Sequence, residues 1–327
     1  MRTLALLTSL LLLAAACDGR GPWSDRGDTT AAGTGVDFGP AAAFERRLLF
    51  LAPGETPPTA AGFDFALVDD STRHYRSARA VVTRDSAWRT LMDTAWSMAP
   101  MRNAWRLVPF GDLHLLVGLN DELEAVTVSG APETRLFLGR AIGEFSPDAG
   151  TRLQLREAEL TTGETTIAGL LLDVQLGRSL QRSGAPHTIV ASAGGRAATP
   201  VLAAATLQPG TTNVEALLAG DGVLLALGEA ADGPLAWLRD GQRDDVWEGT
   251  RLIPTAQAGT QPADTAPDWR VVRGGGDIVA ELRALDRHTV PLPGRAGGTV
   301  GVTVARGWLE IREERVPVVA VLRHVRG

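Results

Sequence analysis

The chain has 327 residues with a formal net charge of −6 at pH 7, and 44% of its residues are hydrophobic. The acidic balance and the lack of a basic patch argue against a nucleic-acid-binding protein, which must neutralise phosphates. Every basic residue is arginine. Without lysine, Schiff-base enzymes, P-loop nucleotide binders and serine–lysine hydrolases are excluded.

The first residues have the pattern of an export signal. Met1 and Arg2 are followed by an apolar run to Ala16 and then by the only cysteine, Cys17. The run is shorter than the roughly 20 apolar residues that a transmembrane helix needs, so we expect it to be cleaved. We therefore predict a signal peptide over residues 1–16.

The residues directly before Cys17 are Ala14, Ala15 and Ala16. They resemble the lipobox of bacterial lipoproteins, except that Ala14 stands where most lipoboxes have leucine. The resemblance implies that the Cys17 sulfur carries a diacylglyceryl group, and a lone exported cysteine has no disulfide partner to compete for it. An ordinary secretory signal with an incidental cysteine is the alternative.

Lipidation of Cys17 implies a partner, the membrane, and a location. The protein is expected in the cell envelope, lipid-anchored and facing the periplasm or the exterior. Asp18 resembles the inner-membrane retention residue of some proteobacteria and favours the inner membrane. Residues 17–43 are rich in Gly, Asp, Thr and Ala without periodicity, which predicts a flexible tether.

From Phe44 onward, short apolar or alternating runs recur between Gly, Pro, Asn and Asp. Runs of this length and spacing are typical of an antiparallel β-sandwich or barrel, so we predict a mainly β protein. The segment 86–97 differs: Trp88, Leu91, Met92, Ala95 and Trp96 follow helical spacing. We expect one amphipathic helix there, packed on a sheet.

Two later stretches, 153–176 and 299–325, each look like a long antiparallel hairpin that ends a domain, and residues 112–118 resemble residues 221–228. We predict two similar β domains, 44–178 and 187–327. The matched pieces are unequally spaced, which predicts a loop insertion near 255–268 in the second domain. Chance similarity between hairpins is the alternative.

Two β domains, few cysteines and a Phe-rich approach to the first domain resemble the tandem lipocalin-like proteins, a bacterial family that includes carotenoid hydratases and AttH-type proteins. The resemblance covers about residues 44–327 and implies lipocalin-like barrels. No motif of the family matches residue by residue, so no catalytic residue can be assigned from it.

Candidate site residues are few. Asp69, Asp70, His74 and Tyr75 form the densest polar cluster and could support acid–base chemistry, although a solvated turn also uses such residues. The indoles of three tryptophans are candidates for a ligand-binding surface, although tryptophans are also core residues: Trp88, Trp96 and Trp105.

The histidines are scattered without the spacing of a zinc site, so neither a metal nor a cofactor is expected: His74, His114, His187, His288 and His324. The main hypothesis is a non-enzymatic envelope lipoprotein that binds an apolar small molecule or a protein partner. The alternatives are a tandem-lipocalin-type enzyme acting on a lipid or isoprenoid substrate and an accessory subunit of a membrane complex.

Overall fold

The computed structural model describes most of the chain from residue 42 onward. The described residues are 42–69, 74–84, 87–98, 113–117, 122–148, 151–179, 212–230, 233–241, 243–255, 269–291 and 299–326. All regular structure within them is β-strand. No helix in these residues is long and apolar enough to cross a membrane.

The first sheet is an antiparallel meander whose first and last strands pair. Its order is β4-β3-β2-β1-β9-β8-β7-β6-β5, so β4 and β5 are its edges. The strands are β1 (Ala42–Ala52), β2 (Thr59–Asp69), β3 (His74–Arg84), β4 (Ala87–Met98), β5 (Leu113–Val117), β6 (Leu123–Val128), β7 (Thr134–Asp148), β8 (Thr151–Thr162) and β9 (Thr165–Ser179).

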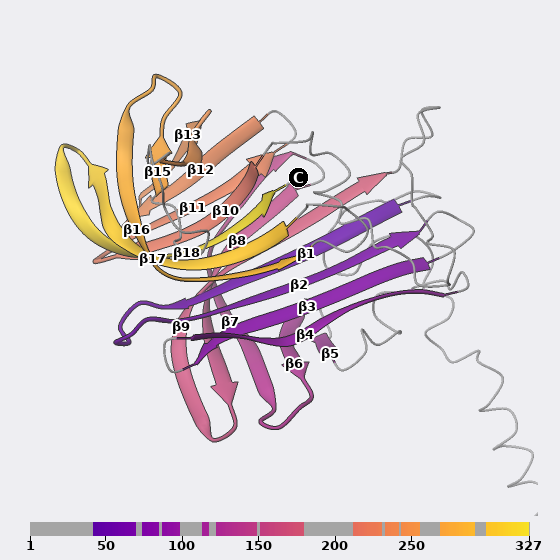
Figure 1. The fold of residues 1–327 in the computed structure, drawn as a ribbon. Helices are drawn as coiled ribbons and strands as arrows, with labels where there is room; N and C mark the ends of the chain where they lie inside the picture. The colour runs from indigo at the N-terminus through magenta and orange to yellow at the C-terminus, as the bar shows by residue number, and fades with distance from the viewer. Residues whose placement is uncertain are drawn as a thin grey trace, which may run out of the picture.

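The second sheet repeats this topology strand for strand. Its order is β13-β12-β11-β10-β18-β17-β16-β15-β14, and both sheets curl into nearly closed barrels (Figure 1). The strands are β10 (Thr212–Gly220), β11 (Val223–Ala230), β12 (Gly233–Asp240), β13 (Arg243–Glu248), β14 (Arg251–Pro254), β15 (Trp269–Val272), β16 (Ile278–Pro291), β17 (Thr299–Ile311) and β18 (Glu314–Arg326). The prediction of two tandem antiparallel β domains is confirmed.

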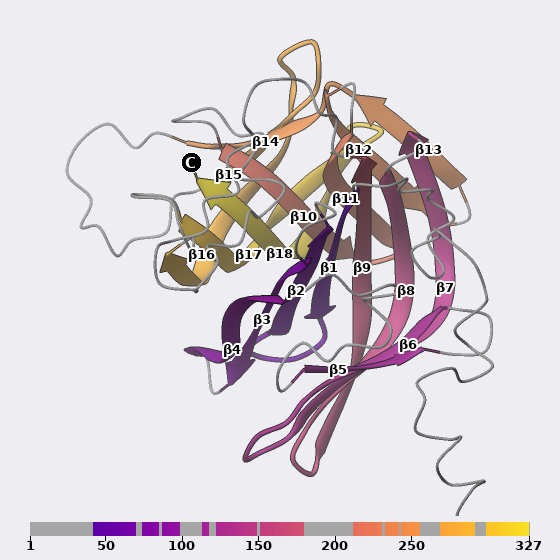
Figure 2. The same cartoon turned by 90° about the vertical axis from the view of Figure 1, so that its right-hand side faces the viewer.

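Each barrel has an apolar interior, and a third apolar cluster lies between the barrels. Leu48 and Phe50 of β1 point into the first barrel, whereas Leu49 and Leu51 pack against the second domain, because successive side chains of a strand alternate in direction. The middle cluster joins residues of β1, β8 and β9 to residues of β10, β17 and β18, which lie against each other in Figure 2.

The interface also contains a buried chain of four charges. The Arg47 guanidinium contacts the Glu215 carboxylate, Arg323 lies 3.6 Å from Glu215, and Arg323 Nε donates to Asp64 Oδ2 at 2.9 Å. Register places Arg47 opposite Val174 in β9 and Glu215 opposite Arg323 in β18, which are corresponding positions of the two repeats. The two domains are therefore joined through equivalent positions of their first strands.

The expected helix at 86–97 is wrong, because this segment is strand β4, paired with β3 along its length. A β-bulge between the pairs Ala80↔Met92 and Val81↔Thr90 inserts Leu91. An inserted residue switches the face that later side chains occupy. Trp88 thus packs on the interface cluster and Met92 in the first barrel, so the helix-like stripe consists of two strand faces joined at a bulge.

The repeat is real, but one of its matched segments is not equivalent. Residues 151–179 correspond to 299–326, as the two hairpins suggested. The segments 112–118 and 221–228 contain β5 and β11, and β11 is the counterpart of β2. Most of the anticipated insertion, 256–268, lies outside the described residues.

Candidate functional site

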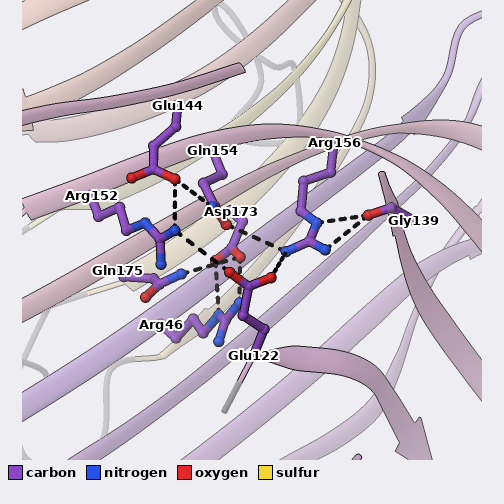
Figure 3. Close-up of polar contacts among 9 residues, drawn as sticks. All are labelled: Arg46, Glu122, Gly139, Glu144, Arg152, Gln154, Arg156, Asp173 and Gln175. Atoms are coloured by element: carbon purple, nitrogen blue, oxygen red, sulfur yellow. Dashed lines mark hydrogen bonds and ion pairs between the residues drawn. The ribbon is translucent and has the colours of Figure 1, made fainter. Parts of the chain in front are cut away.

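The first barrel contains a cluster of charged and amide side chains near the end where β1 begins (Figure 3). It comprises three arginines, three carboxylates and two glutamines, referred to below as the polar cluster: Arg46, Glu122, Glu144, Arg152, Gln154, Arg156, Asp173 and Gln175. The Arg46, Asp173, Gln154 and Gln175 side chains are nearly fully buried. Charges so deeply buried are rare unless they are paired or functional.

Strand alternation places these residues inside the barrel. Leu153 and Leu155 of β8 face the interface cluster, so Arg152, Gln154 and Arg156 between and beside them point inward. Farther along β8, Ala158 and Leu160 continue the same inward face as apolar residues. The barrel interior is therefore polar at one end and apolar at the other.

The deepest contact is a two-pronged ion pair. Arg46 Nε donates to Asp173 Oδ1 at 2.8 Å and Arg46 Nη2 to Asp173 Oδ2 at 2.5 Å. Gln175 Nε2 lies 3.4 Å from the same carboxylate. Because the pair is bidentate and both side chains are buried, it holds the innermost part of the polar cluster in a fixed geometry.

A second ion pair lies farther out. Arg152 Nη2 donates to Glu144 Oε2 at 2.6 Å, and Gln154 Nε2 donates to the same oxygen at 2.8 Å. The hydrogen bond from Arg152 lowers the pKa of the Glu144 carboxyl and raises the pKa of the Arg152 guanidinium. Both groups stay charged at neutral pH.

The third arginine, Arg156, makes no ion pair as short as those of Arg46 and Arg152. Arg156 donates through Nε and Nη2 to the Gly139 carbonyl at 3.0 and 2.8 Å. Its Nη1 reaches only Gln154 Oε1 at 3.4 Å and Glu122 Oε2 at 3.9 Å. Arg152 also lies 3.9 Å from Glu122. Glu122 thus faces two guanidinium groups at distances beyond a normal hydrogen bond.

A pocket of about 360 Å³ opens at the opposite end of the same barrel. It is lined by the β1–β2 turn, the end of β3 and the β8–β9 hairpin, with Val82, Leu160 and Ile167 as its apolar wall. Leu160 lies four positions beyond Arg156 on β8, about 13 Å along the strand. The fully buried Phe50 ring fills this intervening layer, since a Cβ on Gly169 would lie 2.7 Å from it.

The predicted site residues lie elsewhere or outside the described structure. Asp69 of β2 pairs with His74 of β3, and Val68 with Tyr75, at the barrel end that holds the polar cluster. Asp70 lies outside the described residues, and so does the predicted lipidation site Cys17.

The indole candidates are not brought together by any described contact. Trp88 packs on the interface cluster, where its Nε1 is buried without a partner among the described residues. Trp96 pairs with Arg76 in the β3–β4 ladder, and Trp105 lies outside the described residues. Among the described residues, no group of three His, Cys, Asp or Glu side chains could hold a metal.

The polar cluster was not predicted, because the alternation Leu153-Gln154-Leu155 indicates a strand but does not show which of its two faces lies inside the barrel. Both faces of a strand can be buried in a tandem barrel protein, one toward the barrel interior and one toward the other domain. The signal in the sequence is that Arg152, Gln154 and Arg156 share one face with the apolar Ala158 and Leu160. A solvated face would have stayed polar to its end.

Comparison with known proteins agrees with the fold. No protein-family model and no curated protein matches the sequence. The chain is similar to an AttH-type protein from Nitrosomonas europaea, with a TM-score of 0.54 and 11% identity over 88% of this chain and 92% of that chain.

Two further solved structures are more distant. One is kievitone hydratase from Nectria haematococca, with a TM-score of 0.47 and 10% identity over 88% of this chain and 89% of that chain. The other is CghA with Sch210972, with a TM-score of 0.43 and 10% identity over 92% and 93%. At such identities the comparison establishes only the fold, the tandem lipocalin-like architecture that the sequence resembles.

Proposed function

We propose that this protein is a lipid-anchored binding protein of the cell envelope whose first barrel takes up an apolar molecule with an anionic head group. The observation that carries the proposal is the pair Arg152 and Arg156, which both lie 3.9 Å from Glu122 at the polar end of the first barrel. A ligand carboxylate or phosphate placed between these guanidinium groups would form short charge-assisted hydrogen bonds to both.

The exchange is electrostatically balanced. The Glu122 side chain is 38% exposed, so it can turn into water when a ligand anion takes its place. Arg46 and Asp173 stay paired beneath, and the pocket walled by Val82, Leu160 and Ile167 would take the body of the ligand once the Phe50 ring turns aside. An apolar body with one charged end is the shape and chemistry of a fatty acid or an isoprenoid acid.

Replacing Arg156 by glutamine is expected to weaken binding of all-trans-retinoic acid by about 10- to 100-fold, because one charge-assisted hydrogen bond to the head group is lost. The probe has an apolar polyene and one carboxylate. Binding is measured by quenching of tryptophan fluorescence in the full chain carrying Cys17→Ser, which avoids detergent. Retinol, which has the same polyene and a neutral hydroxyl, should be unaffected by Arg156→Gln.

Arg140→Gln is the matched control, since Arg140 lies on the outside of the same barrel with 77% of its side chain exposed. It should leave retinoic acid binding unchanged. Equal binding of retinoic acid by wild type and by Arg156→Gln, with both proteins folded by circular dichroism, would show that the polar cluster is only structural.

The envelope location is supported by the signal-like run and by the lone Cys17. Cys17→Ser is expected to move the protein from the membrane fraction to the soluble fraction, because the acyl chains that hold it are lost. Fractionation followed by intact-mass analysis checks this result. A wild-type protein with unmodified Cys17 would contradict the anchor and leave the ligand proposal intact.

The second candidate function is an enzyme that acts on the same class of lipid or isoprenoid. It is favoured by the backbone pairing of Asp69 with His74 at the barrel end that contains the polar cluster, because a carboxylate and an imidazole are residue types that acid–base chemistry uses. The binding assay separates the two functions. Recovery of unchanged retinoic acid after long incubation favours binding, whereas a product in the mass spectrum favours the enzyme.

A further inference from the structure

The interior of the second barrel contains three buried polar side chains that have no hydrogen-bond partner among the described residues. His324 of β18 is 3% exposed, Trp269 of β15 is 2% exposed and Thr303 of β17 is fully buried. Within the described residues, no hydrogen-bond partner exists for either ring nitrogen of His324, for Trp269 Nε1 or for Thr303 Oγ1. These three residues are called the His324 group below.

The three side chains occupy one region of the barrel. The rings of Trp269 and His324 have centroids 5.4 Å apart. His324 is opposite Gly301 on β17, and Thr303 is the next inward residue of that strand. The imidazole lies directly over Gly301, where a Cβ would come within 2.2 Å of its ring. The unpartnered atoms therefore belong to one site.

The repeat explains why the neighbouring described strands supply no partner. His324 and Thr303 occupy the positions of Gln175 and Gln154 in the first barrel, as the strand registers show. Four charged positions of the first barrel are replaced in the second by side chains without polar groups, whereas Glu144, opposite Gln154, corresponds to Arg287, opposite Thr303. Arg46, Arg152, Arg156 and Asp173 correspond to Val214, Gly301, Ala305 and Leu322.

The chemistry of the His324 group favours an uncharged oxygen. Burial lowers the pKa of His324 to about 3, with further lowering by the nearby Arg287 and Arg323, so the imidazole is neutral at physiological pH. A neutral imidazole offers one donor and one acceptor, the indole offers a donor and the threonine hydroxyl offers both. A ligand hydroxyl, with one donor and two acceptor sites, can bond to all three, and a ligand carbonyl can accept from two of them.

We propose that the second barrel binds an apolar molecule with a neutral oxygen head, an alcohol or a ketone, through His324, Trp269 and Thr303. This site is separate from the polar cluster and has a different ligand preference. The two barrels of one chain would thus bind related apolar molecules that differ in the charge of the head group. The distinction follows from the replacement of Arg46, Arg152, Arg156 and Asp173 by residues without polar side chains at the equivalent positions.

Retinol titration of His324→Phe tests the proposal. Phenylalanine keeps an aromatic ring over Gly301 but cannot hydrogen-bond, so retinol affinity is expected to fall about tenfold, the effect of one lost hydrogen bond to a buried group. His324→Gln retains a donor and an acceptor and should recover most of the affinity. Quenching of Trp269 is the readout, and Trp269→Phe identifies its share of the signal.

Two outcomes would overturn the proposal. Unchanged retinol affinity in a folded His324→Phe protein would place retinol elsewhere, and no retinol binding by wild type would leave the group to a buried water. Failure of the first-barrel proposal is distinguishable, because retinoic acid binding should respond to Arg156→Gln and not to His324→Phe.

Discussion

Glu215→Ala is expected to lower the free energy of unfolding by about 3 to 5 kcal/mol, the effect of breaking a buried ion pair from one side. The Glu215 side chain is 2% exposed and lies between the guanidinium groups of Arg47 and Arg323, which are 1% and 2% exposed. Removing it leaves two buried positive charges facing each other without the carboxylate that separates them. Urea unfolding measures the loss.

The order of the four charges predicts a ranking among variants. Asp64 still pairs with Arg323 when Glu215 is removed, and Arg323 still pairs with Glu215 when Arg47 is removed. Arg47→Met should therefore cost less than Glu215→Ala. Because these charges join the two domains, Glu215→Ala should also split the unfolding curve into two transitions.

Glu281→Gln is the matched control. It removes a carboxylate from the Arg270–Glu281 pair, in which the side chains are 43% and 42% exposed. Exposed pairs contribute at most about 1 kcal/mol, so the midpoint should barely move. A Glu215→Ala protein as stable as this control would mean that water reaches the interface and screens its charges.

The sequence was informative about strands because a strand and its alternation are local properties. Leu48 to Leu51, Leu153 to Leu155 and Val300 to Val304 all predicted strands that the structure contains. The tandem arrangement followed from the terminal hairpins, which the register shows to be equivalent. Local patterns were sufficient to predict strands that pair with the next strand along the chain.

The failures are non-local. The bulge at Leu91 exists only because β4 pairs with β3, and without that pairing Trp88 and Met92 fit a helix equally well. The polar cluster required knowledge of which strand face is interior. Arg46 and Asp173 lie 127 residues apart in the chain, so no window of sequence could bring them together.

In the sequence, His324 is one of five scattered histidines, and nothing there shows that its neighbours in the fold lack polar groups. Val214 and Gly301, opposite it on the two flanking strands, have no side-chain polar group. A sequence shows the histidine but not that its neighbours among the described residues offer it no hydrogen bond. Because the buried imidazole resists protonation, His324 has a measurable effect on how stability depends on pH.

Between pH 6.5 and pH 4.5, the wild-type protein is expected to lose about 2 kcal/mol more stability than His324→Gln. The pKa of His324 is about 3 in the folded protein against 6.5 for an ordinary histidine, because burial and the charges of Arg287 and Arg323 oppose protonation. The unfolded chain therefore binds a proton as the pH falls below 6.5, whereas the folded protein does not until about pH 3. Protonation of the unfolded chain removes stability throughout that window.

Urea unfolding of both proteins at several pH values checks this result. Every other titrating group is common to the two proteins, so the difference between their stability curves isolates residue 324. A difference that grows as the pH falls from 6.5 indicates a neutral, dry imidazole, as hydrogen bonding to a neutral ligand oxygen requires. Parallel curves would instead mean that His324 reaches solvent or a counter-charge, and a charged imidazole would then prefer an anionic head group in the second barrel as well.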